Sequence, residues 1–375
     1  MSLAWTEIKR AKLRFGLLTG AVALLVFLIL FLQTLSGQLL KEFVGGIENQ
    51  SAEVLVYGAE ARRTIEGSTV TPDEVAAVAN VDGVGDSAAF GENTFTVKVN
   101  GGESKDATIF GYELGGPGAP TTLTEGRLPT GEGEAVGASG AGVDFKIGDV
   151  VSVLPGGYEI RIVGLAKDAS FNVQPTLFSS YSTYEQAVRS QNPQAVEVLP
   201  TLVAVEPAAG VSPTELAARI NDQVDGVEAL DKETAIASLP GVSSIQQSFG
   251  LILLLAFIVV VLVTGFFFLI LTVQKIQSLT LLRAIGASTG YLLRSLVLQV
   301  VFVTIGGTAA AGALLVLAAA NSSANFAVTA DPILILGTGT AVLLLAIIAS
   351  IGSIRRVAKL DPAAATQRMA GGGLV

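Results

Sequence analysis

The side chains that most often carry chemistry in proteins are scarce in this chain of 375 residues. It has no cysteine and no histidine, and its two methionines are Met1 and Met369. Disulfides, zinc sites built from cysteine and histidine, thiol catalysis and a serine–histidine triad are therefore excluded. Carboxylates are plentiful, with 29 between residues 41 and 247, but nothing in their spacing singles out a catalytic pair. We expect a chain that is not itself an enzyme.

Nucleotide binding within the chain is also not expected. No G-x-x-x-x-G-K-[ST] sequence occurs, so the chain cannot hold ATP in a P-loop. The glycines at 131–142 resemble a phosphate loop only superficially, because residues 144–149 and a strand follow them rather than a helix. We interpret these glycines as turns, and we expect neither an intrinsic cofactor nor a nucleic-acid partner.

Four uncharged stretches are the elements that must position any functional group. They comprise residues 15–40, 251–273, 295–320 and 333–354. About 20 helical residues span a bilayer, so each stretch is long enough to be a transmembrane helix. The first is too long for the apolar core of a signal peptide and lacks a convincing cleavage site, so we expect it to be a retained anchor. The spans contain no ionisable side chain, which argues against a proton relay.

The distribution of charge orients these spans. The segments 1–14, 274–294 and 355–375 carry 11 basic and two acidic residues, whereas residues 41–247 carry 12 basic and 29 acidic residues. Basic residues are retained in the cytoplasm, so both termini are expected inside and residues 41–247 outside. The sequence thus predicts an α-helical membrane protein with four transmembrane helices and a large extracellular domain between the first and the second. Within the tail, we expect 355–370 to be native and 371–375 to be an appended linker.

Strands and capped helices alternate in the outer domain, which we expect to be α/β. Alternating patterns predict strands at 53–57, 94–99, 150–154 and 158–163. Thr71-Pro72-Asp73-Glu74 and Ser212-Pro213-Thr214-Glu215 both resemble helix starts, and each is followed by an alanine-rich helical run and the tetrapeptide Val-Asp-Gly-Val. They indicate either a duplicated unit flanking an inserted β region or two unrelated capped helices.

The loop at 274–294 contains a basic, amphipathic segment, Gln274 to Ser288, that ends at a glycine cap. It is either an interfacial helix lying on lipid or a helix that docks into a cytoplasmic partner. Gln33 and Gln299 are the main polar side chains within the spans, and we interpret them as contacts between helices. Gly16, Gly20 and the glycines at 306–312 would allow helices to approach closely.

The arrangement as a whole resembles the MacB/FtsX superfamily of ABC-transporter permeases. Leu281-Leu282-Arg283-Ala284-Ile285-Gly286-Ala287-Ser288 is similar to the family's coupling helix, and Lys359-Leu360-Asp361-Pro362-Ala363 to its C-terminal ending. Outside, Glu125-Gly126-Arg127-Leu128-Pro129, Ile147-Gly148-Asp149-Val150 and Ile162-Val163-Gly164-Leu165 resemble the small β-rich part of the family's external domain. One departure is Ser278, where the family commonly has a glutamate.

This resemblance implies partners and a mechanism. Two copies of the permease would pair with two copies of a cytoplasmic ABC ATPase, which contacts Leu282, Arg283, Ala284, Ile285 and Gly286. Nucleotide-driven closure of the ATPases would reach the outer domains through the rigid helices as a two-state rearrangement. The expected location is the cytoplasmic membrane of a bacterium.

Among family members, the chain is most similar to the haem-efflux permeases (HrtB type) of Gram-positive bacteria, which implies haem as the transported substrate. Without histidine, cysteine or a usable methionine, the axial ligand to haem iron would be a carboxylate or a tyrosinate. Glu42, just past the first span, is our first candidate and Glu48 the second, with Tyr57 as a further possibility. Phe43 and Phe249 could stack on a porphyrin, although both could equally be packing residues, and Glu42 could be an interfacial anchor.

Two other functions remain open at this level. A regulator of a cell-wall hydrolase (FtsX type) would move an external enzyme and transport nothing. An exporter of lipoproteins or antimicrobial peptides would keep an apolar groove but bind no porphyrin. The length of the external domain favours transport.

Overall fold

The computed structural model describes residues 11–140, 143–195, 197–274, 288–321 and 330–358. Two compact units make up the chain. The bundle unit comprises residues 1–36 and 248–375, and the outer unit comprises Gly37–Gln247. Each unit is described separately below. The helices are α2 (Lys12–Glu48), α3 (Pro72–Ala79), α4 (Tyr181–Gln191), α5 (Pro213–Gln223), α6 (Lys232–Ser238), α7 (Val242–Gln274), α9 (Thr289–Ala320) and α10 (Pro332–Ala358), with a 3-10 turn η1 (Ala59–Ala61).

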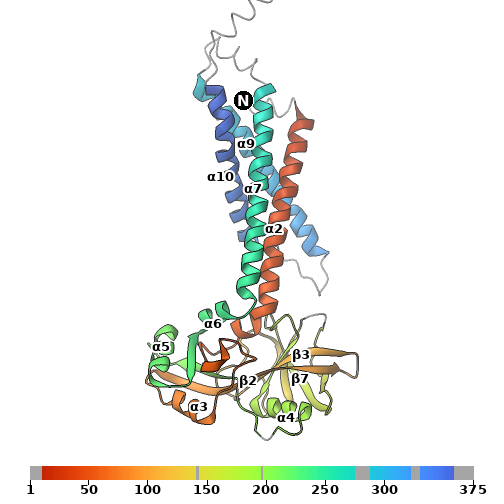
Figure 1. The fold of residues 1–375 in the computed structure, drawn as a ribbon. Coiled ribbons are helices and arrows are strands. Elements are labelled where there is room, and N and C mark those ends of the chain that lie inside the picture. Colours follow the sequence, from red (N-terminus) through yellow and green to blue (C-terminus); the bar gives the residue numbers. More distant parts are fainter. Residues whose placement is uncertain (1–10, 141–142, 196, 275–287, 322–329, 359–375) are drawn as a thin grey trace, which may run out of the picture. The chain divides into compact units, whose positions relative to one another are not determined.

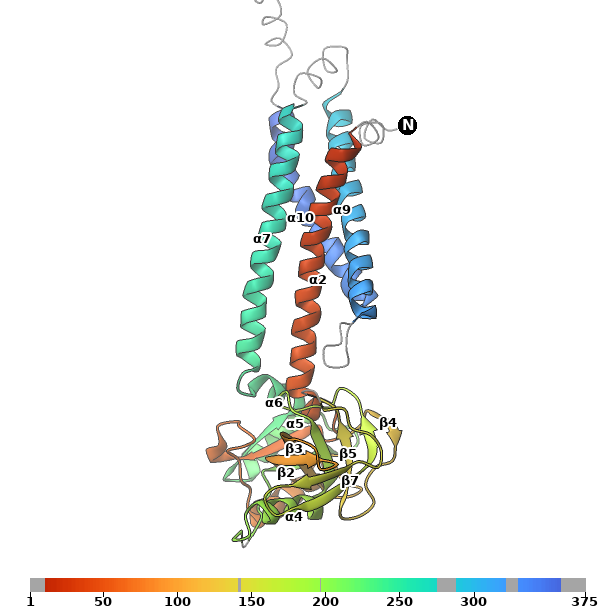
Figure 2. The same ribbon diagram turned by 90° about the vertical axis from the view of Figure 1, so that its right-hand side faces the viewer.

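Four of these helices, α2, α7, α9 and α10, are long and apolar enough to cross a membrane (Figures 1 and 2). Each contains one of the four uncharged stretches found in the sequence, as expected for a four-span membrane protein. The helices extend beyond those stretches, since α2 continues to Glu48 and α7 begins at Val242. The expected boundary between the first span and the outer domain, at residue 41, therefore falls within α2, because a charged side chain does not by itself end a helix. The bundle unit has its own apolar core, to which all four helices contribute.

Glycines bring α9 against α2 in the bundle. A Cβ atom on Gly307 would lie 2.7 Å from Cγ1 of Val22, and one on Gly306 would lie 3.3 Å from Cγ2 of Thr19. The expectation of close packing is therefore confirmed for this pair of glycines. Gly16 and Gly20 have nothing within 4 Å of such an atom among the described residues, so the structure shows no close contact at either position.

The outer unit is built on one ten-stranded sheet. Its strand order is β10-β1-β9-β2-β3-β8-β5-β7-β4, with β6 pairing to β2 and β7. The strands are β1 (Val54–Gly58), β2 (Val84–Val99), β3 (Ser104–Tyr112), β4 (Leu123–Gly126), β5 (Glu134–Ala138), β6 (Val150–Val153), β7 (Tyr158–Ala166), β8 (Thr176–Ser180), β9 (Leu202–Pro207) and β10 (Val227–Asp231). All four strands expected from alternation are present.

The two capped helices belong to matching units at one end of the sheet. Thr71 forms a capping box with Glu74 at the start of α3, and the Ser212 side chain accepts the Glu215 N–H at the start of α5. The units β1–α3–β2 and β9–α5–β10 interleave in the order β10-β1-β9-β2, the arrangement of two split βαβ elements. Both helices pack into one core cluster on the same face. The structure therefore favours the duplicated unit over two unrelated helices.

The chain between β2 and β9 forms the inserted β region, with α4 beside it (Figure 1). One expectation here is wrong. The glycine-rich segment at 131–142 contains strand β5, with residues 135–138 buried, rather than turns alone. Gly137 lies in this strand, and a Cβ atom there would be 2.9 Å from the Phe145 ring. A small residue is needed for this contact, so the strand carries a glycine where strands usually have a larger side chain.

Candidate substrate site

The last turns of α2 are tied to a loop of the outer unit, which we call the 168–174 loop. The N–H groups of Val173 and Asn172 donate to the carbonyls of Glu42 and Phe43, each at 2.9 Å. The Gly46 N–H donates to a carbonyl of the same loop, that of Ser170, at 2.7 Å. The helix segment that carries Glu42 is therefore held by hydrogen bonds to this loop in addition to the hydrogen bonds within the helix.

Two glycines allow this close approach. A Cβ atom on Gly45 would clash with the backbone carbonyl of Asp168, and one on Gly46 would lie 2.7 Å from the Phe110 ring. Such distances are shorter than van der Waals contact, so any larger residue would force the loop and the helix apart. The Gly45-Gly46 pair is a signal for this contact that could have been read from the sequence.

The 168–174 loop itself is strained where it contacts the helix. Asn172 and Val173 have φ values of +54° and +59°, in the left-handed region. Asparagine tolerates this conformation, whereas for a β-branched valine it is a rare and costly one. The hydrogen bonds to α2 hold the turn in place, so the position of α2 and the shape of the loop depend on each other.

The Glu42 carboxylate is half-buried beside this loop. Its Oε2 atom is buried and, among the residues that the structure describes, makes no hydrogen bond of good geometry, although the Ser170 hydroxyl lies close enough to interact with the carboxylate. A Cβ atom on Gly140 would lie 3.0 Å from this oxygen and 2.9 Å from the Ser170 hydroxyl, so these two residues border it. A buried acceptor without a donor costs about 1–3 kcal/mol, a cost that a bound cationic or metal-containing ligand would remove.

The other predicted ligand residues have different environments. Glu48 is exposed at the end of α2, and Phe43 is partly buried against the core, with Gly241 beneath its ring. Tyr57 is only 1% exposed, on β1 within the core, and its hydroxyl has no partner among the described residues. Phe249 is half-buried on α7, in the bundle unit. Within the outer unit, Glu42 and Phe43 thus share one helix end, whereas Tyr57 does not reach the surface.

The predicted ATPase-coupling residues Leu282, Arg283, Ala284, Ile285 and Gly286 lie outside the described residues. The same holds for the C-terminal sequence from Lys359. Within the described part of the chain, no group of three or more acidic side chains is placed to hold a metal ion.

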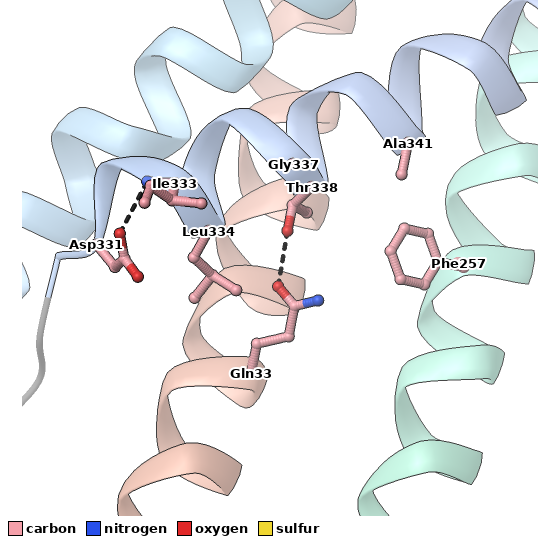
Figure 3. Close-up of a pocket in the computed structure, with 8 residues that line it drawn as sticks. All are labelled: Gln33, Phe257, Asp331, Ile333, Leu334, Gly337, Thr338 and Ala341. Atoms are coloured by element: carbon pink, nitrogen blue, oxygen red, sulfur yellow. Dashed lines mark hydrogen bonds between the residues drawn. The ribbon is translucent and has the colours of Figure 1, made fainter.

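A pocket in the bundle unit was not expected from the sequence. It has a volume of about 390 Å³ and lies between α2, α7 and α10 (Figure 3). Its lining is mostly apolar, with a single hydrogen bond across it, in which the Thr338 hydroxyl donates to Oε1 of Gln33 at 2.7 Å. The interpretation of Gln33 as a contact between helices is thereby confirmed. The lining residues are Gln33, Phe257, Asp331, Ile333, Leu334, Gly337, Thr338 and Ala341.

Glu92 is a second buried carboxylate that sequence reasoning missed. It is 3% exposed on β2, opposite Phe110 of β3, and its Oε2 has no partner among the described residues. Burial, together with the nearby charge of Glu66, raises the pKa of Glu92 to about 8. The side chain is therefore largely neutral at pH 7. Its alternation with Phe90 on a buried face was the available signal.

Comparisons with known proteins cover nearly the whole chain. Residues 15–223 match the family described as the MacB-like periplasmic core domain, and residues 250–362 match the FtsX-like permease C-terminal family. The first of these matches alone spans more than half of the chain.

Three curated relatives are similar at low identity. A protein of Staphylococcus haemolyticus named hemin transport system permease protein HrtB is 23% identical over 312 residues, 82% of each chain. A protein of the same name from Staphylococcus epidermidis is 24% identical over 318 residues, 84% of this chain and 85% of the relative. An uncharacterized ABC transporter permease of Mycobacterium tuberculosis is 24% identical over 325 residues, 85% of each chain.

Proposed function

Because the chain belongs to the family of ABC transporter permeases that join a MacB-like periplasmic core domain to an FtsX-like C-terminal domain, we propose that it extracts haem from the outer leaflet of the membrane. The chain is a non-catalytic, multi-pass subunit of a bacterial cytoplasmic membrane, and its family implies a separate ATPase partner. Haem, the ATP-driven step and the residues that carry them are the proposal.

The observation that carries the proposal is the Glu42 carboxylate, considered together with the relatives named for hemin transport. Glu42 lies past the uncharged stretch of α2, and its buried Oε2 lacks a partner among the described residues. Ferric haem iron accepts a hard oxygen ligand, and the chain has no histidine or cysteine to supply another kind. A bound haem would convert an uncompensated carboxylate oxygen into a metal ligand.

The neighbouring residues support the same role. Phe43 follows Glu42 on the helix and is only partly buried, so its ring has a free surface that could stack on a flat porphyrin. Phe249 is half-buried on α7 in the bundle unit, and its role as a second aromatic contact rests on the sequence alone. Glu48 is exposed and six residues further along α2, which makes it the weaker candidate for the iron ligand.

In the proposed cycle, two permease chains and two ATPase subunits form the pump. ATP binding draws the ATPases together, and the segment containing Leu282 to Gly286 transmits that movement to the helices. Because α2 is continuous from Lys12 to Glu48 and hydrogen-bonded to the 168–174 loop, its movement would carry Glu42 and its surroundings with it. Release of haem then requires no charged tunnel through the spans.

The test is a haem titration of the purified permease with its ATPase, followed by the Soret band. Wild type is expected to give a saturable, shifted band, which Glu42→Ala loses and Glu48→Ala retains. Glu42→Gln, which keeps the size of the side chain and removes its charge, separates ligation from packing and should also lose the shift. Unsaturable partitioning into micelles that is identical in all four proteins would exclude haem and leave the hydrolase regulator and the lipoprotein or peptide exporter.

A further inference from the structure

The pocket between α2, α7 and α10 contains one hydrogen-bond donor that the protein leaves unused. The amide oxygen of Gln33 accepts a hydrogen bond from the Thr338 hydroxyl, whereas Nε2 donates no hydrogen bond to any described residue. Figure 3 shows Nε2 directed towards the space beside Phe257, away from Thr338. Since Thr338 is buried and fixes the amide, the donor is held in one orientation. An oriented donor in an apolar pocket selects a ligand with an oxygen acceptor on an apolar body.

The position of the pocket along α10 indicates where that ligand comes from. The extracellular domain lies between the first and second spans, so the N-terminal end of α10 is at the outer surface. Thr338 is six residues beyond Pro332, which places its hydrogen bond roughly 9 Å below the start of the helix. The pocket is open on one side, since Ile333 is 81% exposed and Gly337 is also exposed. A molecule of the outer leaflet can therefore enter with its polar end near Asp331.

The negative charge of Asp331 at the open end of the pocket further limits the class of ligand. Asp331 lines the pocket, and its Oδ1 accepts the N–H of Ile333 at 2.8 Å, which caps α10. A carboxylate at this place repels an anionic group and attracts an amine. A neutral carbonyl is thus a better partner for Gln33 than a carboxylate would be.

The geometry points to a phospholipid site, in which Gln33 Nε2 donates to an ester carbonyl, Asp331 faces an amine headgroup and an acyl chain fills the space beside Phe257. The ligand is a bilayer lipid such as phosphatidylethanolamine, not the transported molecule. This inference does not depend on haem being the substrate. The bound lipid would stabilise the contact between α2 and α10.

Gly337 and Gly20 provide a matched pair of variants. Both are exposed glycines in membrane-spanning helices, and a Cβ atom at either meets nothing within 4 Å among the described residues. Only Gly337 lines the pocket. Gly337→Leu should therefore place a side chain in the pocket from a position that accommodates its Cβ atom, whereas Gly20→Leu makes the same chemical change elsewhere.

The experiment is a titration of the delipidated full-length permease, followed by native mass spectrometry, with diester phosphatidylethanolamine and with its ether-linked analogue, which lacks the carbonyls. Wild type should bind the diester about fivefold more tightly, as expected for one neutral hydrogen bond. Gln33→Leu should bring this ratio to about one, and Thr338→Val should lower it, because the amide loses its orientation. Gly337→Leu should weaken both lipids about tenfold or more, and Gly20→Leu should weaken neither.

Several outcomes would overturn the lipid site. Lipid binding that is equal in Gly337→Leu and Gly20→Leu would show that the pocket is not occupied. If Gln33→Leu still preferred the diester lipid over the ether lipid, with its helical circular dichroism unchanged, the Gln33 amide would not be the donor to the ester carbonyl. Displacement of the lipid by protoporphyrin in wild type but not in Gly337→Leu would assign the pocket to the transported molecule. The haem proposal fails separately: a wild type that shows no saturable haem binding but keeps the ester preference would exclude haem and support the lipid site.

Discussion

The backbone N–H of Val173 donates to the carbonyl of Glu42 at 2.9 Å, so a strained turn and the proposed ligand residue share one hydrogen bond. Val173 keeps a left-handed conformation that a valine rarely adopts, and Glu42 keeps a buried oxygen without a partner. Each of these features is unfavourable when considered separately. Their coincidence at one contact between α2 and the 168–174 loop is the reason why we propose this region as the substrate site.

Gly45→Ala should separate α2 from the 168–174 loop. The new methyl group would overlap the carbonyl of Asp168, and forced overpacking costs about 1–3 kcal/mol. We expect a lower melting temperature for the full-length protein in detergent. Gly37→Ala is the control, because a Cβ atom there meets nothing within 4 Å among the described residues. Equal melting temperatures for the two variants would show that the close approach at Gly45 is not required.

Glu92→Gln should remove a pH dependence of stability. The pKa of Glu92 is about 8 in the folded protein and near 4.5 when exposed, so the folded state binds more protons between these values. Stability must then fall as pH rises through this range, by about 3 kcal/mol between pH 5 and pH 7.5. The melting temperature of Glu92→Gln relative to wild type should therefore increase with pH. Glu103→Gln, which makes the same substitution at an exposed carboxylate, is the control.

Gly307→Val should loosen the bundle. Its side chain would press on Val22 of α2, which a Cβ atom alone would approach to 2.7 Å. The expected cost is again about 1–3 kcal/mol, seen as a lower melting temperature of the full-length protein. Gly16→Val makes the same change at a position with open space and should melt close to wild type. A destabilisation of equal size in both variants would be explained by valine within a helix and would contradict the role of the α2–α9 contact.

Arg283→Ala tests the proposed ATPase contact. Removal of one partner of an interfacial charge pair commonly costs 2 kcal/mol or more, so ATPase activity of the assembled pump should fall about tenfold or more. Haem binding by the permease should be unchanged, because Arg283 is expected on the cytoplasmic side of the membrane and Glu42 on the outer side. Lys275→Ala, in the same cytoplasmic segment, is the control. Unchanged ATPase activity in Arg283→Ala would place the coupling contact elsewhere.

The sequence by itself determined the membrane-spanning elements, their orientation and the paired helix starts. These follow from local properties. A long apolar run such as 251–273 is unfavourable in water, and basic segments stay on the cytoplasmic side. Thr71 and Ser212 cap the helices that they begin. Such signals depend on neighbouring residues only, so they can be read without a fold.

Only the tertiary structure decided which functional groups are exposed and what surrounds them. Tyr57 and Glu92 lie on strands whose burial depends on the distant segments packed over them, and the pocket at Gln33 exists because α10 crosses α2 at Thr338. Strand β5 escaped detection because Gly137 is fitted to Phe145. Contacts between residues far apart in sequence set burial, and burial sets both the pKa of Glu92 and the unpaired oxygen of Glu42.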